Sequence, residues 1–343
     1  MRAAQVVRHG EPPQAVEVEE IPAPEVGPGA VRVAVAAGSL NYGDIARCRG
    51  GVASVMATPP FTLGMDVCGV VEAAGDGAAA WLGQRVVGIT AMAMGGLAEL
   101  AVVPVQSLFA APPELDDAEA AAFLLPFHLS HLALHRRARL AAGETLLVLG
   151  GASGVGTAAI QLGAVAGATV IASAGGKAKG EVCRSLGAAV AVDHTADDLY
   201  GVVMDATDGR GADVVLDLVG GDATETVWTC VAREGRYVAA GFNDDPQSGL
   251  TGRPLRRVST GNFSVVGVML SYSDAGGDLR PFGLNPFTPA DGQRVHEDLL
   301  ELVAAGRIRP FIGRRIGLED VGPALADHAA RRTVGRTVVE VPR

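Results

Sequence analysis

The sequence predicts an α/β protein in which a doubly wound parallel sheet is inserted into a β-rich domain. Strand-like and helix-like segments alternate from residue 143 to about residue 270, which is typical of a parallel sheet. Short β-branched runs separated by Pro and Gly fill roughly the first 110 residues, and the last residues return to that style. At 343 residues, the chain also exceeds the length at which single hydrophobic cores usually divide, so we expect two domains.

The β-rich region is predicted from runs such as 31–35 and 85–89. The segment 114–139 is instead rich in Ala and Leu, with acids at its start and bases at its end, an order that favours a helix. Pro126 interrupts this segment, so we expect two helices there rather than one. A helix at 295–305 and a final strand-like segment complete this part of the chain.

The alternating region begins with an apolar run at 146–149, which predicts a buried strand. Further strands are predicted at 168–173, 189–192, 213–218, 236–240 and 264–270, and helices at 179–186 and 224–232. Such βαβ units are right-handed and form a parallel sheet. We therefore predict one domain at 120–261 and a second, discontinuous domain made of 1–119 and 262–343.

A glycine-rich turn follows the first of these strands. Gly151, Gly154 and Gly156 lie between the strand and a predicted helix. Unpaired N–H groups at the start of a helix form a seat for pyrophosphate. Ser153 occupies the second place of the G-x-G-x-x-G pattern, so the motif alone does not separate a dinucleotide site from an ordinary turn. Its position after the first strand, where a Rossmann sheet binds a dinucleotide, favours the dinucleotide site.

The end of the second predicted strand indicates which dinucleotide is bound. NAD-selective sites have a carboxylate there to hold the adenosine ribose, yet no acid occurs between Ala172 and Lys179. Ser173 offers a hydroxyl and Lys177 a cation, which is the combination that a 2′-phosphate requires. We therefore predict NADPH, with an ordinary solvated loop as the alternative. His194, after the third strand, is either a further contact of this phosphate or a surface side chain.

Composition disfavours several other classes of protein. The cysteines are far apart and form neither a disulfide framework nor a zinc-binding pattern. A net charge of −10 without a basic run disfavours nucleic-acid binding. No apolar stretch reaches the ~18 residues that a membrane span requires, and the N-terminus lacks the features of a secretory signal. We expect a soluble, cytoplasmic protein that binds a small molecule.

These segments resemble the medium-chain dehydrogenase/reductase superfamily, in particular its zinc-independent NADPH:quinone oxidoreductase (zeta-crystallin-like) branch. The resemblance covers nearly the whole chain and includes AGSLNYGD, PFTLGMDVCGVVEAAGDG, GETLLVLGGASGVGTAAIQLG and GRYVAAGF. It implies a Rossmann NADPH-binding domain within a chaperonin-like barrel domain that binds the substrate. It also implies a homodimer, which the family commonly forms through strands that correspond to 262–271 here.

The resemblance also bears on metal binding and catalysis. In zinc-containing members, a Cys and a His-Glu pair of the first domain hold the metal, whereas this chain has Asn41 and Met65-Asp66 in the corresponding segments. Amide and thioether groups do not replace thiolate and imidazole, so we predict no zinc. Hydride transfer to a quinone or another conjugated acceptor needs positioning more than acid–base catalysis. The resemblance implies this positioning role for Asn41, and we expect Tyr42 to line the pocket.

Other residues have roles that the resemblance implies or leaves open. His128 lies where the family commonly has Tyr and a Gly-Thr pair, and it is either a proton donor or a histidine packed in a helix. The further expected cofactor contacts are Ser153, Gly154, Val155, Gly175, Gly241, Phe242, Asn243, Leu270 and Ser271. Two alternatives to a quinone reductase stay open. One is a double-bond reductase for enoyl thioesters or 2-alkenals, and the other is a non-catalytic, crystallin-like protein that binds NADPH.

Overall fold

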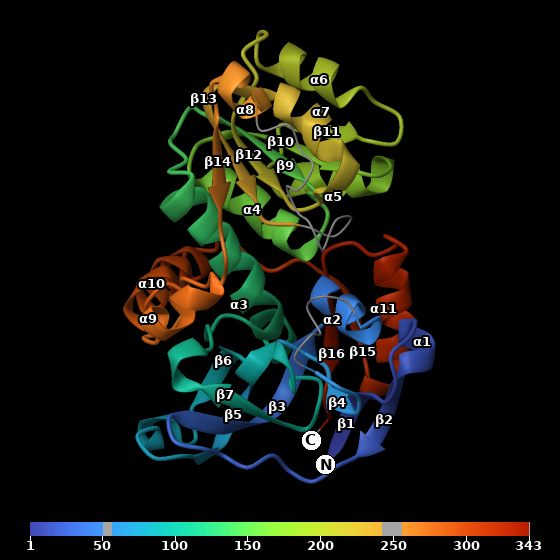
Figure 1. Cartoon of the computed structure of the whole chain (residues 1–343), viewed down its shortest axis with the longest axis vertical. Coiled ribbons are helices and arrows are strands. Elements are labelled where there is room, and N and C mark those ends of the chain that lie inside the picture. Colours follow the sequence, from blue (N-terminus) through green and yellow to red (C-terminus); the bar gives the residue numbers. More distant parts are fainter. Residues whose placement is uncertain (51–56, 242–255, 343) are drawn as a thin grey trace. The chain divides into compact units, whose positions relative to one another are not determined.

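Figure 1 shows the computed structural model, which describes residues 1–50, 57–241 and 256–342. The chain folds into two compact units, and the second is inserted between segments of the first. The first unit comprises Met1–Leu125, Ser271–Ala304 and Arg309–Arg343, and the second comprises Pro126–Leu270 and Ala305–Ile308. The domain boundaries predicted from the sequence, after residues 119 and 261, lie N-terminal to these divisions and stay predictions.

The first unit is built mainly on antiparallel β-structure. Its strands are β1 (Arg2–Val6), β2 (Val16–Glu20), β3 (Ala30–Ser39), β4 (Phe61–Thr62), β5 (Asp66–Ala74), β6 (Arg85–Ile89), β7 (Leu100–Pro104), β8 (Leu108–Ala110), β15 (Ile312–Ile316) and β16 (Arg336–Glu340). In the described residues, the main sheet has the order β15–β16–β3–β5–β6–β8 with β7 also paired to β3, and a smaller sheet has the order β2–β1–β4. Val31, Val33 and Val35 point inward from β3 and pack with Val86 and Leu108 in one core. The predicted β-rich domain is confirmed.

The helices of the first unit pack outside these sheets or connect their strands. They are α1 (Pro12–Ala15), α2 (Tyr42–Cys48), α9 (Gly276–Leu279), α10 (Pro289–Ala304) and α11 (Val321–Ala329). α10 begins earlier than predicted because Thr288 and Asp291 each cap the N–H group of the other. Its buried face carries His296, Leu299 and Val303, which follow the spacing of an amphipathic helix.

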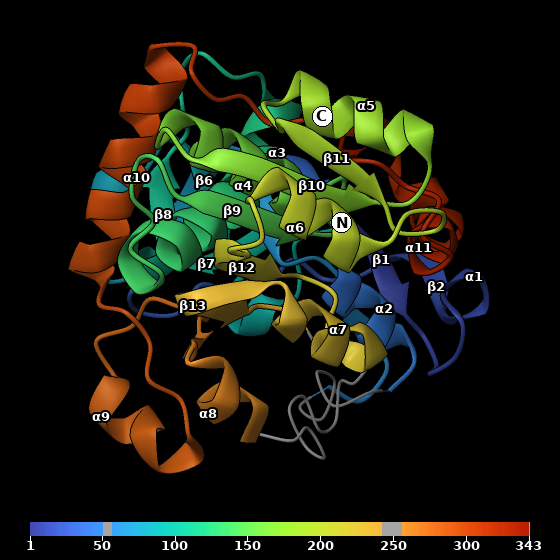
Figure 2. The ribbon, with the colours of Figure 1, turned by 90° about the horizontal axis from the view of Figure 1, so that it is seen from above.

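The second unit is a parallel sheet. Its strands are β9 (Thr145–Leu149), β10 (Thr169–Ala174), β11 (Val190–Asp193), β12 (Ala212–Asp217), β13 (Val231–Ala239) and β14 (Ser264–Gly267). In the part of the chain that the structure describes, these strands lie in the order β11–β10–β9–β12–β13–β14, and every neighbouring pair is parallel. Figure 2 shows the central strands side by side. All residues of β9 are buried, as expected for a strand covered on both faces. The predicted Rossmann sheet is confirmed.

Helices connect most strands of this sheet. They are α4 (Gly154–Val165), α5 (Lys177–Ser185), α6 (Leu199–Ala206), α7 (Thr224–Thr229) and α8 (Arg256–Gly261). α4 packs against β9 and β10, α5 against β10 and β11, and α7 and α8 against β13. Among the described residues of the whole chain, no helix combines the length and the apolar composition that crossing a membrane requires.

The helix around Pro126 differs from the prediction. α3 (Asp117–His131) contains this proline and continues directly into a π-helical segment, Leu132–Arg137. The expectation that Pro126 separates two helices is therefore wrong. Phe123, Leu124 and Phe127 are at most 1% exposed, and burial of large apolar side chains at ~1.5–3 kcal/mol each outweighs the ~3 kcal/mol that an internal proline costs.

The sequence analysis also missed α6. Its sequence, LYGVVMDA, contains a glycine and two valines, which have low helix propensity. The helix is fixed at its start by Asp198, whose carboxylate accepts hydrogen bonds from the N–H groups of Tyr200 and Gly201 at 3.2 and 3.1 Å. This capping aspartate was the available sequence signal.

Candidate functional site

The strand order of the second unit has a switch point between β9 and β12. On one side of that point lie β9, β10 and β11, and on the other side lie β12, β13 and β14. In open parallel sheets, ligands bind at the switch point, outside the carboxyl ends of the strands. The turns that follow β9 and β12 meet there, because a Cβ atom on Gly150 would lie 3.5 Å from Cγ2 of Val219. These two turns are the centre of the candidate coenzyme site.

The turn after β9 places the start of α4 at the switch point. A Cβ atom on Gly156 would lie 2.2 Å from the carbonyl oxygen of Gly150, so only glycine fits there. The Ser153 hydroxyl accepts a hydrogen bond from the Gly156 N–H at 3.1 Å and caps the helix. The N–H groups of Gly154 and Val155 open α4, and the first N–H groups of a helix have no acceptor within it. This helix start can therefore bind a phosphate group.

The end of β10 carries the residues predicted to bind a 2′-phosphate. The carbonyl oxygen of Ser173 accepts a hydrogen bond from the Gly151 N–H at 2.9 Å, which ties this strand to the glycine turn. His194 lies against the following loop, because a Cβ atom on Gly175 would be 3.2 Å from its Cε1 atom. Lys177 is exposed at the first position of α5. The structure gathers these residues at one part of the C-terminal edge of the sheet.

Asp193 adds a carboxylate to this loop, and the sequence analysis missed it. Its Oδ1 atom accepts hydrogen bonds from the Gly176 N–H at 2.9 Å and from the hydroxyl and N–H of Thr195 at 2.6 and 3.0 Å. The Thr195 hydroxyl and these N–H groups lower the pKa of Asp193 to about 2. The segment 172–179 contains no acid, but the carboxylate of Asp193 contacts it at Gly176, so the predicted 2′-phosphate site is not free of acids. The signal that could have found Asp193 was the parallel alignment of β10 with β11, which pairs Asp193 with Ala174.

A second missed carboxylate, Asp217, organises the turn after β12. Asp217 is fully buried, and its Oδ1 atom accepts hydrogen bonds from the N–H groups of Val219 and Gly220 at 2.8 and 2.9 Å. Its Oδ2 atom accepts a hydrogen bond from the hydroxyl of buried Tyr237 at 2.5 Å. Gly241, a predicted cofactor contact, lies beside this turn and donates its N–H to the Asp217 carbonyl oxygen at 2.9 Å.

The remaining predicted cofactor contacts lie elsewhere in the chain. Phe242 and Asn243 are outside the described residues. Leu270 and Ser271 follow β14, with Leu270 in the second unit and Ser271 in the first. The carbonyl oxygen of Ser271 accepts a hydrogen bond from the Phe287 N–H at 3.0 Å. Contact of these four residues with a coenzyme stays a prediction.

In the first unit, Asn41 belongs to a buried cluster with Asp66, Ser39 and Arg336. Nδ2 of Asn41 donates to Oδ1 of Asp66 at 2.8 Å and to the carbonyl oxygen of Ser39 at 3.1 Å. Nη1 of Arg336 donates to Oδ1 of Asn41 at 2.9 Å, and its Nη2 donates to Oδ2 of Asp66 at 2.8 Å. All four side chains are at most 6% exposed. A guanidinium therefore lies against the amide and the carboxylate.

Arg336 is the member of this cluster that the sequence analysis missed. It lies 270 residues from Asp66 in the sequence. β16 carries it to the site by pairing with β3, with Val338 opposite Ser39. No local pattern in the sequence indicates that pairing, because the two strands come from opposite ends of the chain.

Burial shifts the carboxyl groups around Asn41. Desolvation raises the pKa of Asp66, and the Arg336 guanidinium opposes that shift. Asp44 accepts a hydrogen bond from the Asn41 N–H at 2.8 Å, and burial raises its pKa to about 6 although Arg47 opposes the change. Nη1 of Arg47 lies 3.6 Å from Oδ1 of Asp44. The region around Asn41 therefore holds two desolvated carboxyl groups with an arginine beside each.

The other predicted catalytic residues are Tyr42 and His128. Tyr42 is the first residue of α2, and its ring centroid lies 6.0 Å from that of His328 in an edge-on arrangement. His128 lies in α3 and is fully buried. Tyr42 belongs to the first unit and His128 to the second. Their roles in catalysis stay predictions.

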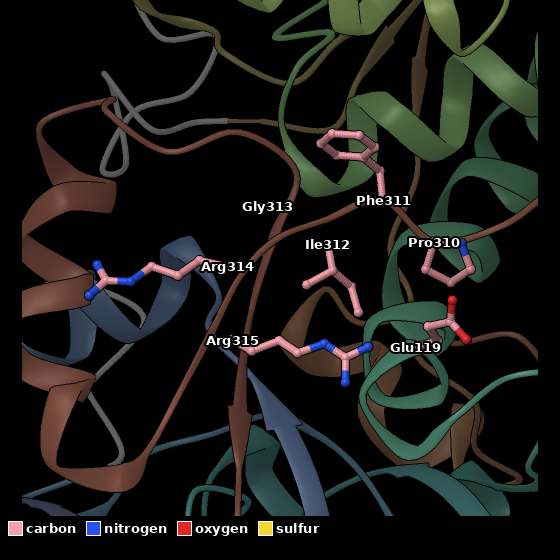
Figure 3. A pocket seen from close by; sticks show the side chains of 7 residues that line it. All are labelled: Glu119, Pro310, Phe311, Ile312, Gly313, Arg314 and Arg315. Atoms are coloured by element: carbon pink, nitrogen blue, oxygen red, sulfur yellow. The ribbon is translucent and has the colours of Figure 1, made fainter.

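A hollow of about 420 Å³ in the first unit is lined by Glu119 and residues 310–315 (Figure 3). Its charged groups are paired within the protein. Arg309 forms a bidentate ion pair with Glu119 at 2.6 and 2.8 Å, and Arg315 binds Asp116 at 2.7 Å. Figure 3 shows the Arg315 side chain extending toward Glu119. This hollow contains none of the predicted catalytic residues, and we do not assign the active site to it.

Comparisons with known proteins agree with both units. The family model of the alcohol dehydrogenase GroES-like domain matches residues 27–113, and that of the zinc-binding dehydrogenases matches residues 154–281. A quinone oxidoreductase from Pseudomonas aeruginosa is 31% identical over 329 residues, which cover 95% of this chain and 96% of that protein. A phthioceranic/hydroxyphthioceranic acid synthase from Mycobacterium tuberculosis is 35% identical over 323 residues, which cover 92% of this chain and 14% of that protein.

Solved structures are similar to the whole chain. The structure of a mycobacterial protein complexed with NADPH has a TM-score of 0.84 and 25% identity, and the match covers 99% of this chain and 100% of that one. A GroES-like domain joined to a Rossmann domain defines the medium-chain dehydrogenase/reductase class. The chain belongs to the quinone oxidoreductase-like family of this superfamily. It is therefore an oxidoreductase of the medium-chain class.

Proposed function

We propose that this protein is a zinc-independent, NADPH-dependent reductase that transfers a hydride to a quinone or another conjugated acceptor. The observation that carries the proposal is the buried cluster of Asn41, Asp66, Ser39 and Arg336. By resemblance, Asn41 and Asp66 stand where zinc-containing members have metal ligands. In this chain, the guanidinium of Arg336 already binds both of them.

Zinc does not fit these residues. Zinc prefers thiolate and imidazole ligands, and the cluster offers an amide, a hydroxyl and one carboxylate. The guanidinium of Arg336 lies within 2.9 Å of Asn41 and of Asp66, so its positive charge would also repel a divalent cation bound by these residues. Alcohol oxidation in this superfamily relies on the metal to stabilise an alkoxide. The cluster therefore favours an acceptor that is already electron-poor and needs no Lewis acid.

NADPH fits the C-terminal edge of the sheet in the second unit. The N–H groups of Gly154 and Val155 would bind its pyrophosphate, and Lys177 and His194 would bind its 2′-phosphate. When bound, NADPH supplies the hydride. Asp193 offers an acceptor for a ribose hydroxyl, although it ends the third strand of this unit and NAD-selective sites have their carboxylate after the second. The preference for NADPH over NADH therefore rests on Lys177.

Asn41 and Tyr42 would position the acceptor in this proposal. The amide nitrogen of Asn41 donates to Asp66 and to Ser39, so its side chain is held in one orientation. A fixed orientation is what hydride transfer requires from the protein. Reduction also consumes a proton, and His128 is the histidine that we propose as its donor.

The match to a segment of an acid synthase favours a second candidate. In this candidate, the acceptor is the double bond of an enoyl thioester. That double bond is conjugated to a carbonyl group, so the demands on the coenzyme site and on Asn41 are the same as for an enone.

The test is oxidation of NADPH by the purified protein with a panel of acceptors. The panel contains benzoquinone, a phenanthrenequinone, a conjugated enone and an enoyl-CoA thioester. Turnover with the quinones or the enone supports the first candidate, and turnover with the thioester alone supports the second. NADPH binding without turnover of any acceptor would contradict both and would favour a non-catalytic role.

We also propose that the protein forms a homodimer through residues 262–271. β14 lies at the edge of its sheet in the described residues, where its unpaired backbone groups can pair with another strand. Light scattering should give twice the mass of the chain. A monomer at all protein concentrations would contradict this proposal.

A further inference from the structure

The turn Leu218–Gly221 is held in place by Asp217, the last residue of β12. The carboxylate of Asp217 accepts hydrogen bonds from the turn and from β13, and its carbonyl oxygen accepts two more. The donors are the N–H groups of Val219, Gly220, Ala240 and Gly241 and the hydroxyl of Tyr237. β12 and β13 lie side by side in the sheet (Figure 2), so one residue joins the ends of both strands.

A carboxyl group in this position is costly for the fold. Asp217 is fully buried, and Tyr237 is 1% exposed. Burial of a carboxyl group is unfavourable unless hydrogen bonds replace its water. Replacing both partners of a buried hydrogen bond by apolar groups of the same shape can leave stability nearly unchanged or raise it. The network is therefore better explained by the geometry that it imposes on the turn than by stability.

That geometry is unusual and tightly constrained. Gly220 and Gly221 both have φ of +70°, which side chains rarely adopt. A Cβ atom on Gly241 would lie 2.1 Å from the carbonyl carbon of Leu218, so the end of β13 touches the turn directly. The other side of the turn meets the glycine-rich turn after β9, because Val219 lies against Gly150. A shift of the turn would therefore change the shape of the candidate coenzyme site at the switch point.

The two halves of a Rossmann sheet bind the two halves of a dinucleotide. The adenosine half lies over the strands that follow the glycine turn, and here that half contains Lys177, Asp193 and His194. The nicotinamide half then lies over β12–β14. The turn Leu218–Gly221 belongs to this second half and borders the pyrophosphate seat.

We propose that Asp217 and Tyr237 are positioning residues for the nicotinamide half of the coenzyme. The Tyr237 hydroxyl orients the Asp217 carboxylate, the carboxylate fixes the turn, and the turn shapes the surface on which the nicotinamide ribose rests. This inference rests on the proposed use of NADPH and concerns two residues, Asp217 and Tyr237, to which the sequence analysis assigned no role.

The test compares two ligands, NADPH and 2′,5′-ADP, which contains the adenosine half with its 2′-phosphate and lacks nicotinamide. Tyr237→Phe removes one hydrogen bond to a carboxylate and keeps the ring. Loss of such a bond should weaken NADPH binding about tenfold. Binding of 2′,5′-ADP should change by less than about twofold. Isothermal titration calorimetry measures both dissociation constants.

Two controls separate positioning from general loss of stability. Lys177→Ala should weaken both ligands, since both carry the 2′-phosphate. Trp228→Phe alters the same core, where Trp228 packs on Tyr237 at 5.9 Å between ring centroids, and it should change neither dissociation constant. If Tyr237→Phe weakens both ligands equally, or weakens neither, the inference is wrong.

Asp217→Asn provides a second variant that keeps the shape and one acceptor oxygen. The Asn side chain can still accept from the turn, so we expect a smaller loss of NADPH affinity than in Asp217→Ala, with 2′,5′-ADP again unchanged. Equal losses for the Asn and Ala variants would contradict the role of the acceptor oxygen. If the wild-type protein does not bind NADPH, the proposed function fails together with this inference. If wild type binds and Lys177→Ala does not, the coenzyme proposal stands and Tyr237→Phe alone decides the inference.

Discussion

Two buried carboxyl groups, Asp66 in the first unit and Asp217 in the second, are stabilised in different ways. Asp66 accepts a hydrogen bond from the guanidinium of Arg336 at 2.8 Å, whereas the partners of Asp217 are a tyrosine hydroxyl and backbone N–H groups. A charged partner supplies a fixed positive charge, while neutral partners fix the path of the backbone. In our proposals, the first arrangement replaces a metal site and the second shapes a coenzyme site.

The strongest test of this difference is Arg336→Ala. The variant leaves Asp66 buried without its counter-charge, and breaking a buried ion pair costs about 3–5 kcal/mol. We expect the free energy of unfolding, measured in urea, to fall by that amount. Arg315→Ala is the control, because Arg315 makes ion pairs with Asp116 and Glu340 at the surface, where each pair contributes about 1 kcal/mol or less. Equal losses in the two variants would contradict a buried, charge-neutralised cluster.

The pH dependence of stability tests whether burial raises the pKa of Asp44, which accepts a hydrogen bond from the Asn41 N–H. Burial raises the pKa of Asp44 to about 6 in the folded protein, above its value of about 3.9 in the unfolded chain. The stabilisation from protonated Asp44 is therefore complete below about pH 4 and is lost as the pH rises through about 6. Asp44→Asn stays neutral, so its stability relative to wild type should rise by up to ~3 kcal/mol between pH 4 and pH 7. A difference that is constant with pH would contradict the raised pKa.

The neutral partner of Asp217 should matter less for stability than Arg336 does. Tyr237→Phe removes one hydroxyl and leaves the aromatic packing, so we expect a loss of about 1–2 kcal/mol in the free energy of unfolding. Tyr200→Phe is the matched control, because Tyr200 is 47% exposed, and surface substitutions usually change stability by about 0.5 kcal/mol or less. A loss from Tyr237→Phe as large as that from Arg336→Ala would show that the two carboxyl groups are not stabilised differently.

The smallest expected effect concerns the choice of coenzyme. Lys177→Ala should raise the KM for NADPH about tenfold and leave that for NADH nearly unchanged, because only NADPH carries the 2′-phosphate. Lys179→Ala removes the same charge two residues later, from a more buried position in α5, and should have a smaller effect. Equal changes for NADPH and NADH in Lys177→Ala would remove the argument for a 2′-phosphate site.

The sequence predicts the parts of the fold that local patterns determine. Apolar runs mark the strands of the second unit, and Gly151, Gly154 and Gly156 mark the turn after β9. Ser153 departs from the usual glycine pattern, and the structure gives its hydroxyl the role of a helix cap. Pro126 shows the limit of such reasoning, because tertiary burial outweighs its local preference.

The parts of the site that the sequence analysis missed depend on pairing between distant strands. Arg336 reaches Asp66 only because β16 pairs with β3. Asp193 joins the coenzyme loop because β11 pairs with β10. Tyr237 reaches Asp217 because β13 pairs with β12. No local pattern in the sequence indicates the pairing of β16 with β3, whereas the other two pairings join strands that the sequence analysis had predicted in one parallel sheet.

The most direct test of the account is turnover and zinc content measured on the same sample. The protein is purified, treated with a strong zinc chelator and assayed for NADPH oxidation with the best acceptor of the panel. We predict that the rate is unchanged when the zinc content falls far below one atom per chain and that added zinc does not raise it. A rate that falls with the zinc content and returns when zinc is added would contradict the proposal that Arg336 takes the place of the metal.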